Sequence, residues 1–349
     1  MTQNLPLVSV IILNYNGKKF LDDCFSSVLE STYPNVETMM LDNASTDDSV
    51  AYTRAKYPAV KIVENPHNNG YSNGYNLSFK HAKGKYFVLL NNDVKVAKDW
   101  LEPLVEAAEQ DEEIAALQPK LVSMIDPSNF EYAGASGGMM DRYGYPFTRG
   151  RLFDHMEKDE GQYDDETEIF WASGAALFLR ADVIKNCGDL DADFVHHMEE
   201  IDFCWRMHLA GYKIKVVPKS LVLHYGGATI SPDSYKKMYW NHRNSTFMLF
   251  KNVGAENFYR ILFMKWWLDF ITISTSFLKL DFKRTRAVIS GHFWLFFHWG
   301  LIARKRKEVQ SNRKVKDAVV FKKLYPKSIA LDYFTKKVRT FSDLKWKIA

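Results

Sequence analysis

Short apolar runs and helix-like stretches alternate through the first hundred residues, and this alternation restricts the fold more than any other feature of the sequence. Runs that predict strands are found at 8–13, 36–41, 60–63 and 86–90. Stretches that predict helices separate them at 20–29, 48–57 and 71–82. Strands that alternate with helices indicate an α/β domain with a Rossmann-like, mainly parallel sheet.

Polar residues follow three of these predicted strands at the point where each strand ends. The clusters are Asn14-Tyr15-Asn16, Asp42-Asn43-Ala44-Ser45 and Asn91-Asn92-Asp93. Ligands of parallel sheets bind outside the carboxyl ends of the strands, so the three clusters would converge on one crevice. Turns also favour Asn, Asp and Ser, and each cluster alone is equally typical of a turn.

Asp93 is the candidate ligand for a divalent metal in this crevice. Mg²⁺ and Mn²⁺ prefer oxygen ligands and bridge protein carboxylates to substrate phosphates. The alternative is that Asp93 caps a helix that begins after Val96. His224, at the end of a short predicted strand, is either a second metal ligand or an ordinary polar residue.

Residues 196–202 combine two histidines with three carboxylates. A helix predicted over 199–209 and ended by Gly211 would place Glu199 and Asp202 on one face and Glu200 elsewhere. One interpretation is that the acids stabilise the N-terminus of this helix. The other is that one of them is a general base that takes a proton from an attacking hydroxyl.

The rest of the middle region is more mixed. Residues 126–168 are expected to form loops, 170–179 a buried strand with a glycine kink, and 212–217 and 222–224 two strands.

Several common enzyme classes lack their motif in this chain. GxGxxG, GxxxxGK[ST], GxSxG and HExxH are all absent, which argues against dinucleotide-binding turns, P-loop NTPases and the corresponding hydrolases. The three scattered cysteines, Cys24, Cys187 and Cys204, predict neither a disulfide framework nor a CxxC metal site, and favour a reducing compartment. The first apolar run has no basic residues before it, so it is expected to be a strand and not a signal peptide.

From about Asp233 the composition changes, which suggests a catalytic domain over 1–232 and a helical region over 233–349. Segment 258–280 is aromatic and apolar but contains charges that make it a poor membrane span, and 288–303 is too short for one. Both are typical either of interfacial amphipathic helices or of core helices in a helical subdomain.

Residues 301–349 hold 15 Lys and Arg against 4 Asp and Glu, while the first 300 residues are mildly acidic. Such a tail favours an anionic surface, either lipid or nucleic acid. No nucleic-acid-binding module is recognisable, and the acidic remainder opposes that partner. We therefore expect no nucleic acid, and a peripheral location at a membrane surface.

Taken in order, the motifs resemble those of the inverting family 2 glycosyltransferases with a GT-A fold, and most closely the bacterial rhamnosyltransferase-like members that build surface polysaccharides. The segments that carry this resemblance are 8–17, 42–49, 65–76, the Asn91-Asn92-Asp93 triplet, Trp171 to Ala176, Glu199 to Asp202 with Arg206, and His224 to Gly227. They span about residues 7–230.

The resemblance implies a role for each matching position. Residues that would bind the UDP- or dTDP-sugar donor are Asn14, Asn16, Asp42, Asn43, Asn69, Asn73 and Asn92, with Asp42 accepting from the imide of the base. Residues that would line the acceptor and donor pocket are Trp171, Gly174, Asp202 and Arg206. Asp93 and His224 would hold Mn²⁺ or Mg²⁺. Glu200 is the first choice for the base and Glu199 the second.

The acceptor implied by the resemblance is a glycan or a polyprenyl-diphosphate-linked glycan at the cytoplasmic face of the cell membrane. Two positions depart from the family pattern: Asn91 replaces the first carboxylate of the metal triplet, and Glu200 replaces Asp. These departures leave open a catalytically impaired scaffold in a polysaccharide assembly complex. The sequence does not specify the sugar, the linkage or the oligomeric state.

Overall fold

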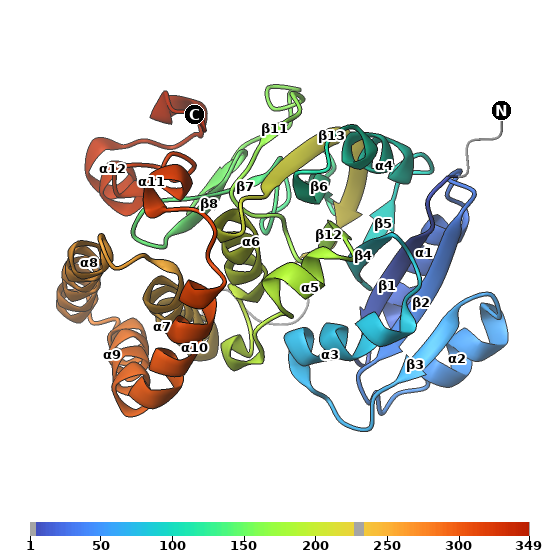
Figure 1. The fold of residues 1–349 in the computed structure, drawn as a ribbon, viewed down its shortest axis with the longest axis horizontal. Helices are drawn as coiled ribbons and strands as arrows, with labels where there is room; N and C mark the ends of the chain where they lie inside the picture. Colours follow the sequence, from blue (N-terminus) through green and yellow to red (C-terminus); the bar gives the residue numbers. More distant parts are fainter. Residues whose placement is uncertain (1–4, 227–233, 349) are drawn as a thin grey trace.

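A computed structural model describes residues 5–226 and 234–348 of the chain. Its centre is a nine-stranded sheet in the order β11-β13-β6-β12-β4-β1-β2-β3, with β5 paired to β13 (Figure 1). The four strands at one edge run parallel: β1 (Val8–Asn14), β2 (Val36–Asp42), β3 (Lys61–Glu64) and β4 (Tyr86–Asn91). The predicted α/β architecture with a mainly parallel sheet is confirmed.

The other half of the sheet contains one long reversed strand, β12, and two short ones, β5 and β11, that run antiparallel to β13. β12 (Ala176–Arg180) runs antiparallel to both β4 and β6 (Ile114–Ser123), and β13 (Lys213–His224) runs parallel to β6. Two short strands complete it: β5 (Val94–Val96) and β11 (Thr167–Glu168). β6, β13 and the first four strands therefore all point their carboxyl ends toward the same edge.

Alternate residues of the strands face different helices. Val8, Val10 and Ile12 of β1 pack with α1 (Lys18–Leu29) and α4 (Leu101–Gln110), while Ile11 faces the core that contains Tyr75 of α3 (Gly70–Ser78). This two-residue period is expected of a strand covered on both faces. The remaining helices of this part are α2 (Ser49–Lys56), α5 (Val183–Cys187) and α6 (Glu199–Leu209).

Three local predictions in the middle region are wrong. Part of 126–168 forms a second, four-stranded sheet and not loops: β7 (Gly138–Met140), β8 (Pro146–Thr148), β9 (Arg151–Leu152) and β10 (His155–Met156). The strand predicted over 170–179 begins only at Ala176, because the backbone N–H groups of Phe170 and Trp171 turn aside to donate to the carbonyl of Gly138.

The two strands predicted over 212–217 and 222–224 are one, β13, with a register shift between Val217 and Leu221. Pro218 lies inside the shift, and a proline has no N–H to donate to a ladder, so it is tolerated at an irregularity of this kind.

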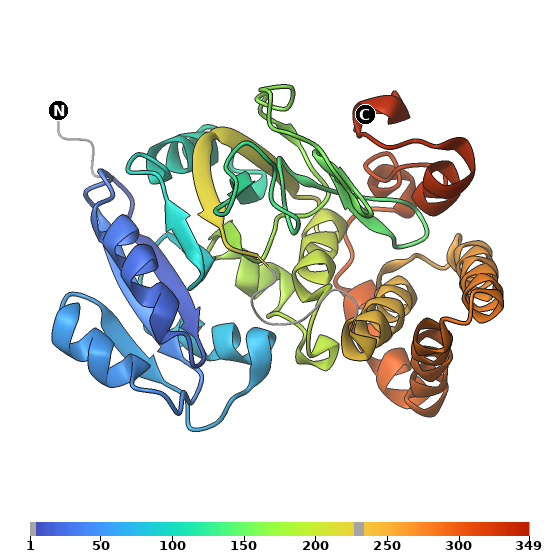
Figure 2. The ribbon, with the colours of Figure 1, turned by 180° about the vertical axis from the view of Figure 1, so that it is seen from behind.

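The C-terminal region is helical, as expected. It consists of α7 (Tyr235–Asn252), α8 (Phe258–Leu278), α9 (Phe282–Phe297), α10 (Trp299–Ser311), α11 (Asp317–Val320) and α12 (Ile329–Lys336). The apolar run 288–303 is divided between α9 and α10 at His298. Figure 2 shows these helices gathered at one end of the molecule, beyond α6.

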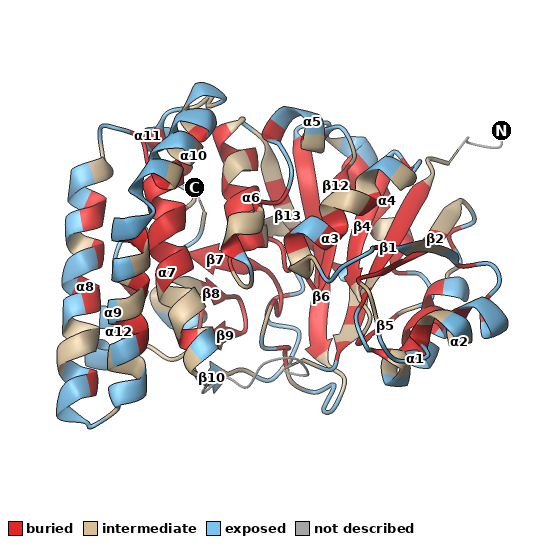
Figure 3. Ribbon diagram, turned by 90° about the horizontal axis from the view of Figure 1, so that it is seen from below, coloured by how far each residue is buried: buried red, intermediate tan, exposed pale blue. Residues whose placement is uncertain are grey.

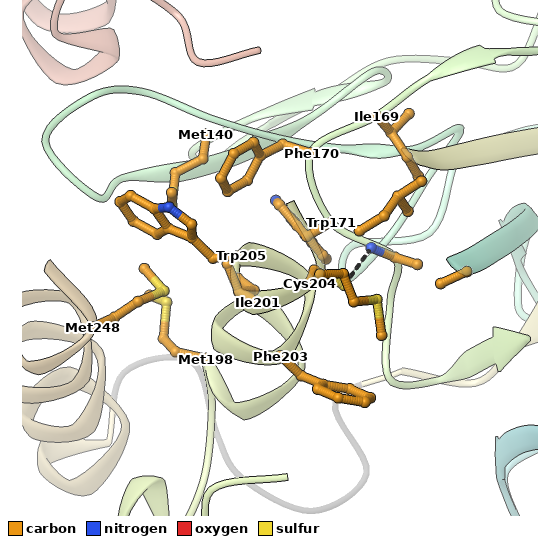
Figure 4. Close-up of a cluster of buried hydrophobic side chains, with 14 of the residues drawn as sticks. Met140, Ile169, Phe170, Trp171, Met198, Ile201, Phe203, Cys204, Trp205 and Met248 are labelled. Carbon is orange, nitrogen blue, oxygen red and sulfur yellow. Dashed lines mark hydrogen bonds between the residues drawn. The ribbon is translucent and has the colours of Figure 1, made fainter. Parts of the chain in front are cut away.

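α6 is enclosed between the sheet side of the molecule and α7. Trp205 of α6 is fully buried against Phe170, with ring centroids 5.5 Å apart, and Met198 and Met248 lie in the same buried cluster (Figure 4). The Sγ atom of Cys204 accepts from the backbone N–H of Ala172 at 3.4 Å. The helical region thus shares a hydrophobic core with the sheet, and the domain boundary predicted between 232 and 233 lies outside the described residues.

Candidate active site

The ends of β1, β2 and β4 meet in one hydrogen-bonded group. Asn14 and Asp42 are paired across β1 and β2, and the Asn14 side-chain amide donates to Asp42 Oδ1 at 3.0 Å. Asn92, just beyond β4, donates to Asn14 Oδ1 at 2.8 Å. Three predicted donor-site residues are therefore brought together because their strands end at one edge.

Gly17 makes this arrangement possible. A Cβ atom at position 17 would lie 2.0 Å from Asn92 Nδ2 and 2.6 Å from Asn14 Oδ1. Any larger side chain would break the contact between the two amides, so the glycine that follows β1 has a steric reason in addition to turn formation.

Asp42 is buried, with 2% of its surface exposed, and most of its acceptor capacity is used. Oδ1 accepts from Asn14 and from the Ser45 hydroxyl at 2.6 Å, and Oδ2 accepts from the Ser45 backbone N–H at 2.9 Å. A carboxylate has about four lone-pair sites, so one position on Oδ2 is left for a ligand.

Asn16, Asn43 and Asn69 shape the surrounding loops. The side-chain oxygen of Asn16 (Oδ1) accepts from the backbone N–H of Thr46 at 2.7 Å. The Asn43 side chain accepts from the backbone of Asn69 at 3.1 Å and donates to Gly70 O at 3.0 Å. These asparagines fix the loops around the crevice, and the side-chain amide of Asn69 also donates to a neighbouring carbonyl.

Asn73 lies elsewhere. It is exposed on α3 and lines a cavity of about 310 Å³ together with Arg206 and Asp191, and the cavity lining includes neither Asp42 nor Asp93. The structure therefore groups Asn73 with Arg206 and not with the donor-site asparagines.

Asp93 and His224 face each other across the crevice. β5 pairs with β13 so that Val94 lies opposite His224, which places His224 Nε2 3.2 Å from Asp93 Oδ1. The segment after Asp93 is a strand, so the alternative interpretation of Asp93 as a helix cap is wrong.

Sequence reasoning missed Glu131, which completes this cluster. Its side chain is buried, and Oε1 lies 3.2 Å from Nδ1 of His224. Its other oxygen accepts from the backbone N–H of Ala133 at 2.6 Å. With Glu131 beside Nδ1, the imidazole presents Nε2 toward Asp93, an arrangement similar to metal sites where a carboxylate orients a ligating histidine.

Two carboxylates also set the charge of His224 in the chain without metal. Burial by itself would lower the pKa of this imidazole, but Glu131 and Asp93 outweigh it and raise the pKa to about 10. A cation is thus already favoured between these carboxylates.

Glu199 and Glu200 begin α6, and both are poorly solvated. Burial and the neighbouring Glu200 charge raise the pKa of Glu199 well above its usual value, and burial raises that of Glu200 to about 7. In the described part of the chain, neither Oε2 atom has a hydrogen-bond partner. Both carboxyl groups are therefore available for proton transfer, and Glu200, the less buried of the two, is suited to act near neutral pH.

The loop before α6 holds an unusual backbone conformation. Val195, His197 and Met198 have φ values of 66°, 66° and 74°, a region that non-glycine residues seldom adopt. Asn244 of α7 supports this loop by donating to the carbonyls of His196 at 2.8 Å and His197 at 2.7 Å. Backbone strain of this kind is typical of functional sites and here lies directly before the two glutamates.

Gly174 lies between the donor-side group and the glutamates. Its carbonyl accepts from the Tyr71 hydroxyl at 2.8 Å, and a Cβ atom at position 174 would lie 2.5 Å from the hydroxyl oxygen of Tyr71. The next residue, Ala175, accepts from Asn91 at the end of β4. Glu199 and Glu200 are close enough to Tyr71 to raise the pKa of its hydroxyl further, beyond the larger effect of burial.

Trp171 belongs to the core under this site. It is 3% exposed, and its indole N–H donates to Met139 O at 2.7 Å. Its ring packs directly on Gly138, where a Cβ would lie 2.2 Å away. In this structure the Trp171 side chain is therefore part of the hydrophobic core that underlies the site.

Asp202 and Arg206 form a buried ion-pair network that attaches α6 to α7. Asp202 is fully buried and lies 3.0 Å from Arg206 Nε and 2.9 Å from Lys251 Nζ. Asn252 donates to its other oxygen at 2.8 Å. These contacts are internal, which indicates that Asp202 positions α6, while Arg206 also lines the cavity beside Asn73.

Replacing Asp202 by Ala is expected to lower the free energy of unfolding by about 3 kcal/mol, because it leaves buried cations with fewer partners. Asp193→Ala is the matched control: its side chain is 36% exposed and paired with Lys305, so its loss should cost less than about 1 kcal/mol. Urea denaturation of both variants measures the difference, and equal effects would contradict the buried-network role.

Comparisons with known proteins agree with this arrangement. The sequence profile described as "Glycosyl transferase family 2" matches residues 9–184, half of the chain. An N-acetylglucosaminyl-diphospho-decaprenol L-rhamnosyltransferase of Mycobacterium tuberculosis is 24% identical over 267 residues, covering 71% of this chain and 85% of that protein. An uncharacterized glycosyltransferase of Haemophilus influenzae is 31% identical over 127 residues, covering 36% of this chain but only 39% of its own length.

The fold has solved counterparts. The structure of GalNAc-T7 with UDP, GalNAc and Mn²⁺ aligns with a TM-score of 0.55 and 18% identity, over 71% of this chain and 48% of that one. At this identity the likeness concerns the fold alone, which is the GT-A fold expected from the motifs. With a family profile over half its length and the polar ends of three strands gathered at one edge, the chain belongs to glycosyl transferase family 2.

Proposed function

We propose that this glycosyltransferase moves a sugar from a UDP- or dTDP-linked donor to a hydroxyl group of a glycan acceptor, with inversion and with the assistance of a divalent metal. The observation that carries the proposal is the combination of Asp42 at the strand ends, the Asp93–His224 pair, and two glutamates whose buried Oε2 atoms have no described hydrogen-bond partner. Donor recognition, diphosphate binding and proton removal each have a candidate residue there.

The donor base would bind at Asp42. The free acceptor position on Oδ2 suits the imide N–H of uracil or thymine, and Asn14 and Ser45 hold the carboxylate in place. That the fold is shared with a protein solved with UDP supports a uridine or thymidine nucleotide.

Asp93 and His224 would hold the metal. Among the described residues no group of three His, Cys, Asp or Glu side chains could bind an ion alone. One carboxylate and one oriented imidazole nevertheless fit Mg²⁺ or Mn²⁺, which commonly take their remaining ligands from phosphates and water. When bound, such an ion supplies charge neutralisation for the leaving diphosphate.

Glu200 would serve as the general base, with Glu199 as the second candidate. In its ionised form, Glu200 accepts the proton of the acceptor hydroxyl while that oxygen forms the new bond to the anomeric carbon. The bond from this carbon to the diphosphate breaks on the opposite face, so the configuration inverts. The proton ends on the glutamate and the electron pair on the diphosphate.

The acceptor would be a glycan, either free or carried on a polyprenyl diphosphate at the cytoplasmic face of the membrane. The name of the M. tuberculosis relative describes a lipid-linked acceptor and a rhamnosyl donor, which supports this class.

Calorimetric titration with UDP and with dTDP, each with and without Mn²⁺, tests the donor site. We expect binding of one nucleotide that the metal strengthens, and an inverted anomeric centre in the product by NMR. The scaffold alternative predicts no turnover with either donor type. A folded chain that binds neither nucleotide would overturn the proposal.

Glu131→Ala is expected to weaken Mn²⁺ binding in the presence of the bound nucleotide by about 10-fold or more, because the imidazole loses its orienting carboxylate. Glu131→Gln keeps an acceptor oxygen near Nδ1 and should lose less. Electron paramagnetic resonance of Mn²⁺ measures the affinity without relying on turnover. Equal affinity in Glu131→Ala and the unmodified chain would show that Glu131 does not position His224.

A further inference from the structure

The helices α8 and α9 and the first residue of α10 expose a set of aromatic side chains at one end of the molecule. We call this set the aromatic face; its members are Tyr259, Phe263, Trp266, Trp267, Phe270, Phe277, Phe282, Phe293, Phe296, Phe297 and Trp299. Each of these side chains is at least half exposed, and the exposed fraction reaches 84% for Tyr259 and 75% for Phe296. Single exposed apolar residues are ordinary, but a contiguous patch of this kind marks an interaction surface.

The sequence periodicity accounts for this face. On α8 the exposed aromatics between Tyr259 and Phe270 recur every three or four residues, and Phe277 follows seven residues later. The intervening Ile261, Leu262 and Leu268 are buried against the protein. On α9, Gly291 allows close packing on α7, since a Cβ there would lie 3.3 Å from the Arg243 backbone. Figure 3 shows buried residues on the inner sides of these helices and exposed residues on their outer sides.

Two charged residues of α8 point inward and fasten the helix to the catalytic part. Lys265 and Asp269 are fully buried and 2.9 Å apart. Asp269 also lies 3.3 Å from His242 of α7, 3.1 Å from His292 of α9 and 3.3 Å from the Tyr145 hydroxyl between β7 and β8. Of the charges that made 258–280 a poor span in the sequence, Lys265 and Asp269 are therefore absent from the outer surface, while Arg260 and Lys279 are exposed.

α8 is, among the described residues, the helix long and apolar enough to cross a membrane, with a mean hydropathy of 1.3. Its inner side is nevertheless occupied by α7, α9 and Tyr145. A helix held sideways in this manner can lie along an interface with its outer side in the lipid, while the catalytic part stays in water.

The charge around the aromatic face favours an anionic partner. Between residues 258 and 299 the acidic residues are Asp269, which is buried, and Asp281, which is paired with Arg284 at 3.1 Å. Arg260, Lys279 and Arg286 are exposed near it. Aromatic side chains flanked by cations, with Asp281 as a partly exposed acid that is already paired, match the headgroup region of an anionic bilayer.

The basic tail itself is less available than its composition predicts. Lys305 is paired with Asp191 at 2.8 Å, Arg306 donates to Val253 O at 2.7 Å, and Lys323 is paired with Glu168 at 3.2 Å. These three cations hold the C-terminal region to the rest of the chain, while others such as Arg304, Lys307 and Lys322 remain exposed.

We propose that the aromatic face of α8 and α9 docks on the surface of an anionic lipid bilayer. α7 connects this surface to the catalytic crevice: Tyr235 lies 5.3 Å under Arg286 of α9, while Asn244 holds the loop before Glu199. Docking would bring the crevice to acceptors carried by the same membrane, which is the acceptor class proposed above.

Co-sedimentation of the full chain with lipid vesicles tests this surface. The probes are vesicles of phosphatidylcholine alone and of an equal mixture with phosphatidylglycerol, and binding is expected to be stronger to the mixture. Phe296→Ser combined with Phe297→Ser should weaken binding by at least about 10-fold, because two exposed phenyl rings no longer enter the interface. Both positions are exposed, so the fold should be retained.

The matched control combines Val319→Ser with Phe334→Ser, which removes apolar side chains that are 49% and 68% exposed outside the aromatic face. This control is expected to bind vesicles like the unmodified chain. No binding to either vesicle, or equal binding by the two double variants, would overturn the proposal. The proposal would also be overturned if sedimentation analysis showed a dimer of the unmodified chain and a monomer of the Phe296/Phe297 variant alone. The aromatic face would then be covered by a second copy of the chain and not by lipid.

The docking proposal and the proposed function can fail separately. The aromatic-face variant should keep the nucleotide affinity of the unmodified chain, since it leaves Asp42, Asp93 and Glu200 unchanged. Vesicle binding without nucleotide binding would contradict only the sugar-transfer proposal, and the reverse result would contradict only the docking surface.

Discussion

Replacing Glu200 by Gln is expected to lower the rate of sugar transfer about 10³-fold while leaving nucleotide binding unchanged. Gln has nearly the same shape but cannot accept the proton of the acceptor hydroxyl, and a positioned general base contributes about 10²- to 10⁴-fold. Glu199→Gln is the matched control. It removes the neighbouring carboxyl group, which is the more buried and the more strongly perturbed of the two, and should cost less than about 10-fold if Glu200 is the base.

The pH profile gives the same prediction a second readout. Only the ionised form of Glu200 can act as a base, and its pKa of about 7 means that this form grows as the pH rises through 7. Transfer by the unmodified chain should therefore increase through neutral pH and level off above it, and Glu200→Gln should lack this limb. A larger loss in Glu199→Gln than in Glu200→Gln would exchange the roles of the two glutamates.

Replacing Asp93 by Asn is expected to lower transfer by about 10²-fold or more and to remove the effect of Mn²⁺ on nucleotide affinity. The site already has Asn91 in place of one carboxylate, so Asp93 is the acidic group left in its triplet. Losing it leaves His224 and neutral amides to face the diphosphate, and charge stabilisation of a leaving group is worth several kcal/mol.

Calorimetry with and without Mn²⁺ measures this effect, and Asp99→Asn is the matched control. Asp99 is an exposed residue six positions away, and the same change of charge there should leave metal and nucleotide binding intact. If Asp93→Asn still showed metal-strengthened binding, the metal would have to be held by other residues, and the assignment of Asp93 and His224 would be wrong.

The donor-side group could be predicted from the sequence because its geometry follows from topology. Asn14, Asp42 and Asn92 each follow a strand of the parallel part of the sheet, and parallel strands end at the same edge. The family resemblance then supplied a role for each residue, and the helical nature of the C-terminal region followed from its composition.

Glu131 could not be found in this way, because it reaches His224 only through the bridge of Phe130 to Val122 of β6 and the pairing of β6 with β13, which join segments far apart in the chain. The sequence around it, Phe130-Glu131-Tyr132, gives only the weak indication of an acid between aromatics. The burial of two predicted pocket residues could not be read from the sequence either. Trp171 and Asp202 belong to motifs that suggest a pocket, but packing against Gly138 and pairing with Lys251 make them structural in this fold.

The shared core of α6 and α7 limits how such enzymes can be recombined. Asn244 supports the backbone before Glu199, and Met248 packs in the same cluster as Trp205. A chimaera that joined the first 232 residues to the C-terminal region of a relative would therefore replace the α7 side of this core together with the proposed docking helices. Exchange of acceptor or membrane preference between relatives should succeed only when α6 and α7 come from the same parent, so these two helices have to evolve as a unit.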